Sequence, residues 1–293
     1  MQAPQPLRAV VDVGLTSPTE PQRQMAANDE GKTKRDEAVP AGLVPRAAAS
    51  RIERSFRDHF APHEPVYFLY GTKAPAAKFQ LSFKYRIFGD SPGDLDTTRN
   101  SLQFGYTQRS LWDLEGNSSP FYDTSYMPEL FYEYLTPEPP EGSGKITFLG
   151  VQAGYGHESN GREALNSRSI NMIFIRPSVA LGHIGGWRVI LIPKFFTYVS
   201  DLSDNRDIRK YRGFGEARLI LGKNEGPQFS TSFIVGSGWE HRTLQFDFSM
   251  PVRFHAGDFA TYFLVQYFNG YSESLLRYQE KTSVLRAGFC FVR

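Results

Sequence analysis

Hydrophobic and polar residues alternate strictly along most of the chain after about residue 65. Successive side chains of a β-strand point to opposite faces, so a period of two predicts half-buried antiparallel strands. One side of the pattern is rich in Lys, Arg, Asp and Glu, and the other side is rich in Phe, Leu, Tyr and Val. The clearest examples are 78–87 (KFQLSFKYRI), 243–254 (TLQFDFSMPVRF) and 285–292 (LRAGFCFV). This division predicts one hydrated, ion-paired face and one apolar face.

About twelve strand-like segments are expected, separated by turn-forming stretches such as 91–94 (SPGD), 115–120 (EGNSSP) and 136–144 (TPEPPEGSG). They lie near 65–70, 77–88, 101–114, 124–135, 145–159, 168–181, 187–200, 207–222, 227–239, 242–254, 260–272 and 283–292. Many have about ten residues or more, the length that a tilted strand needs to cross a membrane. Strands of soluble proteins average about half that length.

An even number of strands closes into a barrel that has no free edge. We therefore predict an all-β fold, a transmembrane antiparallel β-barrel of about 12 strands within residues 51–293. The alternative is a soluble β-sandwich that has one polar face on each sheet.

Composition changes this picture little. The mean hydropathy of −0.40 is that of a soluble protein, and no apolar run approaches the roughly 18 residues of a membrane helix. A barrel hides its membrane signal in alternation, so hydropathy does not detect it. The net charge of +2 does not indicate a basic surface for binding nucleic acid. The single cysteine, Cys290, excludes an internal disulfide framework and a cysteine-based metal site.

The first part of the chain has a different composition. Residues 1–50 are rich in Ala, Pro, Arg, Glu and Gln, and we expect them to form a flexible N-terminal arm. Residues 51–64 are expected to be an ordered lead-in to the first strand. No charged-then-apolar signal segment opens the chain, so either a signal peptide has been removed or export is not indicated.

Candidate chemistry is concentrated in residues 156–171, which read GHESNGREALNSRSIN. His157 and Ser159 are two residues apart, so they share one face of a strand. A hairpin through the turn-rich stretch that follows would return Asn171 beside them. A hydroxyl, an imidazole and an amide that orients the imidazole form a nucleophile–base–orienter set. The alternative is that His157 and Ser159 solvate a membrane boundary and Asn171 caps a turn.

All three side chains continue the apolar positions of their strands. The residues in line with them are Thr147, Leu149, Val151, Ala153 and Tyr155 before the turn, and Ile173, Ile175, Pro177, Val179 and Leu181 after it. The set is therefore expected on the lipid-facing side of the barrel.

Gln108 is a second polar residue in an apolar row, in line with Leu102, Phe104, Tyr106 and Trp112. An amide in hydrocarbon seeks a hydrogen-bonding partner. Alternatively, a β-bulge shifts the register and turns Gln108 into the lumen.

The residues from about 60 to 293 resemble the outer-membrane phospholipase A family of Gram-negative bacteria. The resemblance rests on KFQLSF (78–83), YTQRSLW (106–112), SSPF (118–121), GHESNGR (156–162), SRSIN (167–171), DNRDIRKY (204–211) and GYSESL (270–275). It implies a twelve-stranded outer-membrane barrel that needs calcium and dimerises when active. It also implies A1/A2-type hydrolysis of acyl ester bonds in phospholipids and lysophospholipids.

The resemblance assigns a role to each residue of the central motif. It implies that Ser159 is the nucleophile, His157 the general base and Asn171 the residue that orients the imidazole. A backbone amide near Gly161, together with the calcium ion, would stabilise the oxyanion.

The resemblance also implies a calcium site that two subunits share. Its groups would be the carbonyl of Arg162, the hydroxyl of Ser167, and Ser118 of the partner subunit, with water completing the shell. The family's second calcium site uses two aspartates. Asp204 matches one of them, but Ala164 occupies the other position, and this departure puts calcium binding by the monomer in question.

Two classes of function remain open from the sequence. One is a lipolytic enzyme, and the other is a non-enzymatic outer-membrane barrel, either a small channel or a degenerate homologue. The polar faces carry charges of both signs, which favours an ion-paired plug over an open pore. The residues expected in this lumen are Lys84, Arg86, Glu129, Glu133, Lys210, Arg212, Glu216 and Arg218.

Overall fold

The computed structural model describes residues 51–90, 97–137, 146–182, 186–199, 201–223, 225–253 and 260–293. The expected N-terminal arm (residues 1–50), the turn at 91–94 and most of the turn at 136–144 lie outside these ranges. Among the described residues, no helix is long and apolar enough to cross a membrane.

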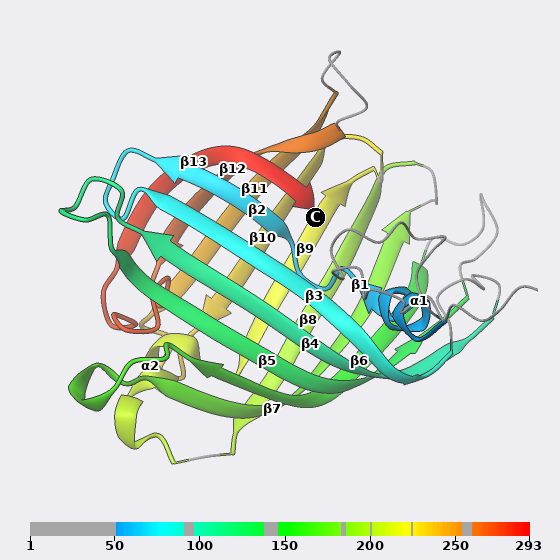
Figure 1. Ribbon diagram of the computed structural model, residues 1–293, viewed down its shortest axis with the longest axis horizontal. Coiled ribbons are helices and arrows are strands. Elements are labelled where there is room, and N and C mark those ends of the chain that lie inside the picture. Colours follow the sequence, from blue (N-terminus) through cyan, green and yellow to red (C-terminus); the bar gives the residue numbers. More distant parts are fainter. Residues whose placement is uncertain are drawn as a thin grey trace, which may run out of the picture. The chain divides into compact units, whose positions relative to one another are not determined.

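The elements follow one another as a succession of antiparallel strands (Figure 1). They are α1 (Arg51–Asp58), β1 (Phe60–Ala61), β2 (Val66–Gly71), β3 (Ala77–Gly89), β4 (Arg99–Trp112), β5 (Phe121–Leu135), β6 (Ile146–Ser159), β7 (Ser169–Gly182), β8 (Arg188–Tyr198), α2 (Ile208–Arg212), β9 (Gly215–Gly222), β10 (Gln228–Val235), β11 (Arg242–Arg253), β12 (Ala260–Gly270) and β13 (Thr282–Val292). Short 3-10 helices span Ala164–Asn166 and Ser203–Asn205.

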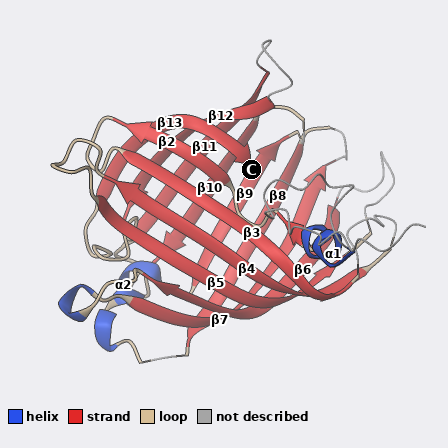
Figure 2. Cartoon of the chain, in the orientation of Figure 1, coloured by secondary structure: helices blue, strands red, loops and turns tan. Residues whose placement is uncertain are grey.

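The sheet closes on itself because β13 pairs with β2. Every strand from β2 to β13 pairs with its neighbours in sequence, and the short β1 adds to β3. Without β1, the described residues form a closed antiparallel barrel of twelve strands, which confirms the predicted fold class. Figure 2 shows that strands make up the wall and that the described helices lie at its two ends.

The two faces of the wall have opposite chemistry. Large apolar side chains point outward and are exposed, among them Phe68, Leu81, Leu130, Tyr132, Ile173, Phe195 and Phe289. Polar side chains are buried on the inside, among them Lys78, Gln80, Ser82, Glu133, Gln266 and Arg286. An apolar exterior around a polar interior is the arrangement of a membrane-spanning barrel.

A short segment of the first wall strand turns into the lumen. β1 and β2 pair with successive parts of the same edge of β3, and residues 62–65 lie between them. We call residues 62–65 the inward bulge; they carry His63 and Glu64 between two prolines. The His63 ring stacks on Phe131 with centroids 5.2 Å apart. Gly105 provides the space, because a Cβ there would lie 3.0 Å from His63 Nε2.

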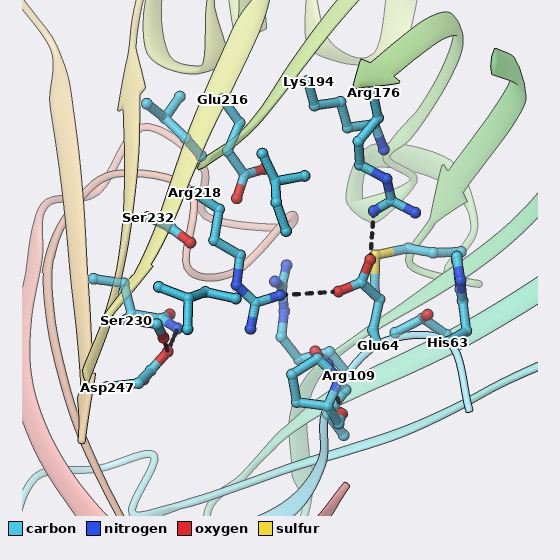
Figure 3. A pocket seen from close by; sticks show the side chains of 18 of the residues that line it. His63, Glu64, Arg109, Arg176, Lys194, Glu216, Arg218, Ser230, Ser232 and Asp247 are labelled. Carbon is cyan, nitrogen blue, oxygen red and sulfur yellow. Dashed lines mark hydrogen bonds and ion pairs between the residues drawn. The ribbon is translucent and has the colours of Figure 1, made fainter. Parts of the chain in front are cut away.

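Ion pairs join the inward bulge to other parts of the wall (Figure 3). Glu64 accepts hydrogen bonds from Arg176 of β7 at 2.5 Å and from Arg218 of β9 at 3.3 Å. His63 Nε2 lies 2.9 Å from a carboxylate oxygen of Glu129 on β5. The lumen around them is a cavity of about 630 Å³. Further pairs inside the barrel are Lys84–Glu133, Lys194–Glu129, Arg212–Glu158 and Arg286–Glu273.

The prediction of one continuous strand over 207–222 is wrong, because α2 precedes β9 there. Ile208 is fully buried in an apolar cluster with Ile170, whereas Lys210 is exposed and is not the lumen residue that was expected. Gly213 has a φ of +56°, and a Cβ there would lie 2.0 Å from the Val235 carbonyl oxygen. Gly213 therefore allows the chain to turn sharply at the end of α2, and its agreement with the alternating pattern of a strand is a coincidence.

The alternation expected along 147–159 is also interrupted. The pairing of β6 with β7 shifts register between Phe148 and Gly150, and Gly150 has a φ of +150°. As a result Ile146 and Phe148 are the exposed apolar residues at the start of β6, in place of Thr147 and Leu149. Beyond this β-bulge, the outward row from Val151 to Ser159 is undisturbed.

Candidate active site

The hairpin of β6 and β7 brings the predicted catalytic residues to one face of the barrel. His157 and Asn171 are direct partners across the two strands, and Ser159 is paired with Ser169. Tyr155 and Ile173, in line with them, are 44% and 54% exposed. The three side chains therefore lie in an outward-facing row, outside the lumen and its cavity.

The Nδ1 atom of His157 lies 2.7 Å from Oδ1 of Asn171. An amide oxygen only accepts hydrogen bonds, so Nδ1 must carry the proton. In the neutral imidazole, the other ring nitrogen, Nε2, is then unprotonated and free to accept a proton. This tautomer is the one that a general base requires.

Ser159 is half-buried, on the same face as His157 and two residues further along β6. Among the described hydrogen bonds, none joins its hydroxyl to the His157 ring. Bonds of this type are often long or poorly aligned until substrate is bound. The structure thus brings His157 and Asn171 into direct contact and places Ser159 beside them.

The loop that follows Ser159 is held by one buried amide. Asn160 Oδ1 accepts hydrogen bonds from the backbone nitrogens of Arg162 and Arg168 at 3.3 and 3.0 Å, and its Nδ2 donates to Asn166 O at 2.8 Å. This leaves Gly161 at a φ of +64°, where a Cβ would lie 2.9 Å from the ring of Tyr126. The position of the expected oxyanion donor therefore requires a glycine.

Glu158, between His157 and Ser159, points the opposite way and anchors the strand from inside. Its side chain is buried and accepts two hydrogen bonds from the Arg212 guanidinium, at 2.5 and 3.2 Å. Arg109 lies 3.8 Å from the same carboxylate. The alternation of side chains along β6 is a signal for this support, since a glutamate between two outward residues must point inward, but the Arg212 contact was not predicted.

The residues expected at the shared calcium site lie on two loops, after β4 and after β6, and Asp204, expected at the second site, lies on a third loop, after β8. The side chain of Arg162 donates to the carbonyl oxygens of Phe121 and Tyr122, at 3.3 and 2.7 Å. Ser167 Oγ donates to Asp204 Oδ2 at 2.9 Å. Ser118 is exposed in the turn after β4, at a φ of 63°.

The oxygen atoms of these residues are of the kind that bind a hard cation. Within the described residues, no group of three or more His, Cys, Asp or Glu side chains could hold a metal ion. The expected ligands are instead hydroxyl and backbone carbonyl oxygens, with the Asp204 carboxylate bonded to one of them. Calcium prefers oxygen ligands of these kinds, so the donor chemistry fits the ion.

The half-buried Gln108 lies in an outward row of β4, paired with the exposed residues Leu81 and Tyr126. Its Oε1 accepts a hydrogen bond from Tyr106 OH at 3.2 Å, and its Nε2 donates to Ser110 Oγ at 3.4 Å. These contacts lie along the strand on the apolar exterior of the barrel. The alternative placement of Gln108 inside the lumen is thereby excluded.

Comparisons with known proteins agree on one family. The family model described as phospholipase A1 matches residues 48–291. A phospholipase A1 from Proteus vulgaris is 32% identical over 208 residues, and a putative phospholipase A1 from Neisseria meningitidis is 30% identical over 226 residues. These alignments cover 69% and 75% of this chain, but only 64% and 55% of the two relatives.

The fold is similar to that of solved members of the same family. Outer membrane phospholipase A from Escherichia coli superposes with a TM-score of 0.66 at 26% identity, over 79% of this chain and 91% of that chain. A Salmonella typhi outer membrane phospholipase, solved as a dimer with bound calcium, gives a TM-score of 0.67 at 26% identity, over 79% and 92%. Both the matched length and the shared barrel lead to the same assignment: the chain belongs to the phospholipase A1 family.

Proposed function

We propose that this chain is a calcium-dependent phospholipase of a bacterial outer membrane, active as a homodimer. Its substrates are phospholipids and lysophospholipids, and it hydrolyses their acyl esters with A1/A2-type specificity. The observation that carries the proposal is the contact of His157 Nδ1 with Asn171 Oδ1 beside Ser159, on the apolar exterior of the barrel.

The reaction begins with proton transfer from Ser159 to His157. Because Asn171 holds the Nδ1 proton, Nε2 accepts the hydroxyl proton as Ser159 Oγ attacks the ester carbonyl carbon. The imidazolium then gives this proton to the oxygen of the leaving alcohol, and an acyl-serine remains. Water, deprotonated in turn by His157, hydrolyses the acyl-serine and releases the fatty acid.

Stabilisation of the oxyanion is assigned to the loop after β6. The backbone N–H near Gly161 is the proposed donor. The carbonyl of Arg162, the hydroxyl of Ser167 and Ser118 of the partner subunit would hold calcium. When bound, the ion would supply positive charge near the developing oxyanion. Asn171 carries no charge, so its share is to orient the imidazole.

The location on the exterior fits a lipid substrate. Tyr155, Ile173 and Ile175 are exposed around the catalytic row, where acyl chains of a bilayer would contact them. Phospholipid esters at the edge of the membrane can then reach Ser159 without entering the lumen. A channel would have no use for such a row on its outer surface.

The interior also favours an enzyme over a channel. Glu64 bridges Arg176 and Arg218, and His63 contacts Glu129, so ion pairs cross the described part of the lumen. Opening a continuous water path would require these partly buried pairs to separate, which is costly.

Phospholipid hydrolysis in detergent micelles, with calcium or with a chelator, tests the proposal. Ser159→Ala should keep a folded, heat-modifiable barrel and lose nearly all activity. The matched control is Ser169→Ala, which removes the hydroxyl directly opposite on β7 and should remain active. Comparable turnover by Ser159→Ala and the wild type would exclude Ser159 as the nucleophile.

A further inference from the structure

A fourth side chain contacts the proposed catalytic row. Tyr155 lies on β6, two residues before His157 and on the same outward face. Its hydroxyl donates to Asn171 Oδ1 at 2.5 Å. This is the same oxygen that receives His157 Nδ1 at 2.7 Å. Since an amide oxygen has two lone pairs, Tyr155 and His157 together use its full accepting capacity.

Asn171 needs such a restraint more than a carboxylate would. A carboxylate presents an acceptor to the imidazole in either orientation. If the amide rotates by 180°, its NH₂ group faces Nδ1 instead of its oxygen. His157 would then have to accept at Nδ1 and hold its proton on Nε2, and it could not deprotonate Ser159. The terminal torsion of asparagine is broad and roughly two-fold, so its own rotamer preference does not prevent this rotation.

A tyrosine is well suited to hold the amide. Its ring has only two side-chain torsions, and Tyr155 extends from the middle of a paired strand with Ile173 directly across. In an apolar environment the phenol must also satisfy its own hydroxyl, and Asn171 Oδ1 is the acceptor that it contacts.

We propose that Tyr155 is a positioning residue of this site, whose hydroxyl keeps the Asn171 amide oxygen directed at His157. This inference rests on the proposed function, because it assigns Tyr155 a part in the same Ser–His–Asn reaction. Tyr155 contacts neither Ser159 nor the reacting ester, and it acts only through Asn171.

The other role for Tyr155 is that of a membrane-interface tyrosine, with its hydroxyl in the headgroup region. That role affects lipid contact and stability, and it does not depend on Asn171. The two roles therefore differ in whether the effect of removing the hydroxyl persists once Asn171 is gone.

A double-mutant cycle separates them. Tyr155→Phe should lower kcat roughly fivefold, the loss expected for one hydrogen bond, and leave KM unchanged. In an Asn171→Ala background, the same substitution should cause no further loss. Assays would use a phospholipid in detergent micelles with saturating calcium, and folding would be checked by heat modifiability.

Tyr132→Phe is the matched control. Tyr132 also lies on the exterior, on β5, and its hydroxyl donates to Asn100 Oδ1 at 2.7 Å, away from the catalytic row. It should leave kcat and KM unchanged.

Three results would overturn the inference. They are an unchanged kcat for Tyr155→Phe, an equal fold-loss with and without Asn171, or a change confined to KM. Ser159→Ala, assayed in parallel, distinguishes the failures. If Ser159→Ala is inactive and Tyr155→Phe is fully active, only this inference is wrong. If Ser159→Ala retains full activity, the proposed function fails, and the inference falls with it.

Discussion

Ser167 and Asp204 are joined by a hydrogen bond of 2.9 Å from the serine hydroxyl to Oδ2 of the carboxylate. The resemblance assigns Ser167 to the calcium site shared between subunits and Asp204 to the second site. The bond therefore connects the two expected calcium sites, because Ser167 lies in the loop after β6 and Asp204 lies in the 3-10 helix Ser203–Asn205. Asn205 fixes that helix, since its side chain bonds both backbone groups of Ser169. With its hydrogen directed at Asp204, the Ser167 oxygen keeps its lone pairs for a cation.

Asp204→Ala should therefore raise the calcium concentration that gives half-maximal activity, by roughly 10-fold or more, as for other residues that orient a metal ligand. Calcium titration of phospholipid hydrolysis measures the change. Glu163→Gln is the control, because it removes a negative charge from the same loop without a bond to Ser167. Equal shifts in the two variants would show that charge alone, and not the Ser167 contact, is responsible.

The proposed roles of His157 and Asn171 predict unequal losses. His157→Ala should lower kcat by about 10²–10⁴-fold, the usual contribution of a general base. Asn171→Ala should lower kcat by only about tenfold, since Asn171 orients the base but transfers no proton. Steady-state kinetics of the two purified variants would decide. A larger loss for Asn171→Ala would require another residue to be the orienting partner or the base.

Gln108 is expected at the interface between two barrels. Its amide already bonds Tyr106 and Ser110 on its own strand, so pairing with a second subunit exchanges these contacts for new ones. Gln108→Ala should weaken self-association modestly, by about 1 kcal/mol or roughly fivefold. Analytical ultracentrifugation in detergent, with calcium and with chelator, measures this.

The same centrifugation experiment tests the shared calcium site. An ion held by two subunits stabilises the dimer, because it binds that state preferentially. Calcium should therefore tighten self-association of the wild type. A fully active, calcium-independent monomer would refute the shared site and leave the serine chemistry intact.

Acid should loosen the contact between the loop after β12 and the segment before α2. Asp207 accepts hydrogen bonds from Tyr278 OH and from Gln279 Nε2. Burial alone would raise the pKa of the Asp207 carboxyl, but these two hydrogen bonds hold that pKa below its ordinary value. The contact therefore stabilises fully above the ordinary aspartate pKa of about 3.9, and this contribution is lost as the pH falls through the lowered pKa.

Asp207→Asn should accordingly unfold at a lower temperature than the wild type at pH 7, and the difference should shrink below about pH 4. Thermal unfolding followed by heat modifiability at several pH values tests this. Asp201→Asn serves as the control, because Asp201 lies in the same segment and, among the described hydrogen bonds, its side chain accepts only from the backbone nitrogen of Ser203. A difference that does not change with pH would contradict the assigned cause.

The barrel could be predicted because lipid and lumen impose opposite demands on alternate residues. Along β3, Phe79, Leu81 and Phe83 meet the exterior while Gln80 and Ser82 are buried inside. Predictions from the alternating pattern were wrong at two glycines. Gly213 and Gly150 fit a period of two in the sequence, yet one ends α2 and the other marks the register shift in β6.

Contacts between distant residues could not be predicted. Glu64 and Arg176 are 112 residues apart, and Ser167 and Asp204 are 37 residues apart, so no local spacing relates them. The pairing of His157 with Asn171 could be predicted, because the two residues are only 14 positions apart and the turn-rich stretch between them forms one hairpin. The hydroxyl of Tyr155 was missed because tyrosine fits an apolar row as well as phenylalanine does.

The inward bulge has a consequence for how the barrel closes during folding. β2 is six residues long, and it is the strand that pairs with β13 to complete the wall. A slip of two residues keeps the same side chains outward, so the apolar pattern alone discriminates weakly against it. Such a slip would move Glu64 by roughly 7 Å along the wall. Its carboxylate would leave Arg176 and Arg218 and remain partly buried without these partners, which costs free energy. The inward bulge therefore helps to select the correct register between β2 and β13, because a shifted pairing of these strands loses the Glu64 ion pairs.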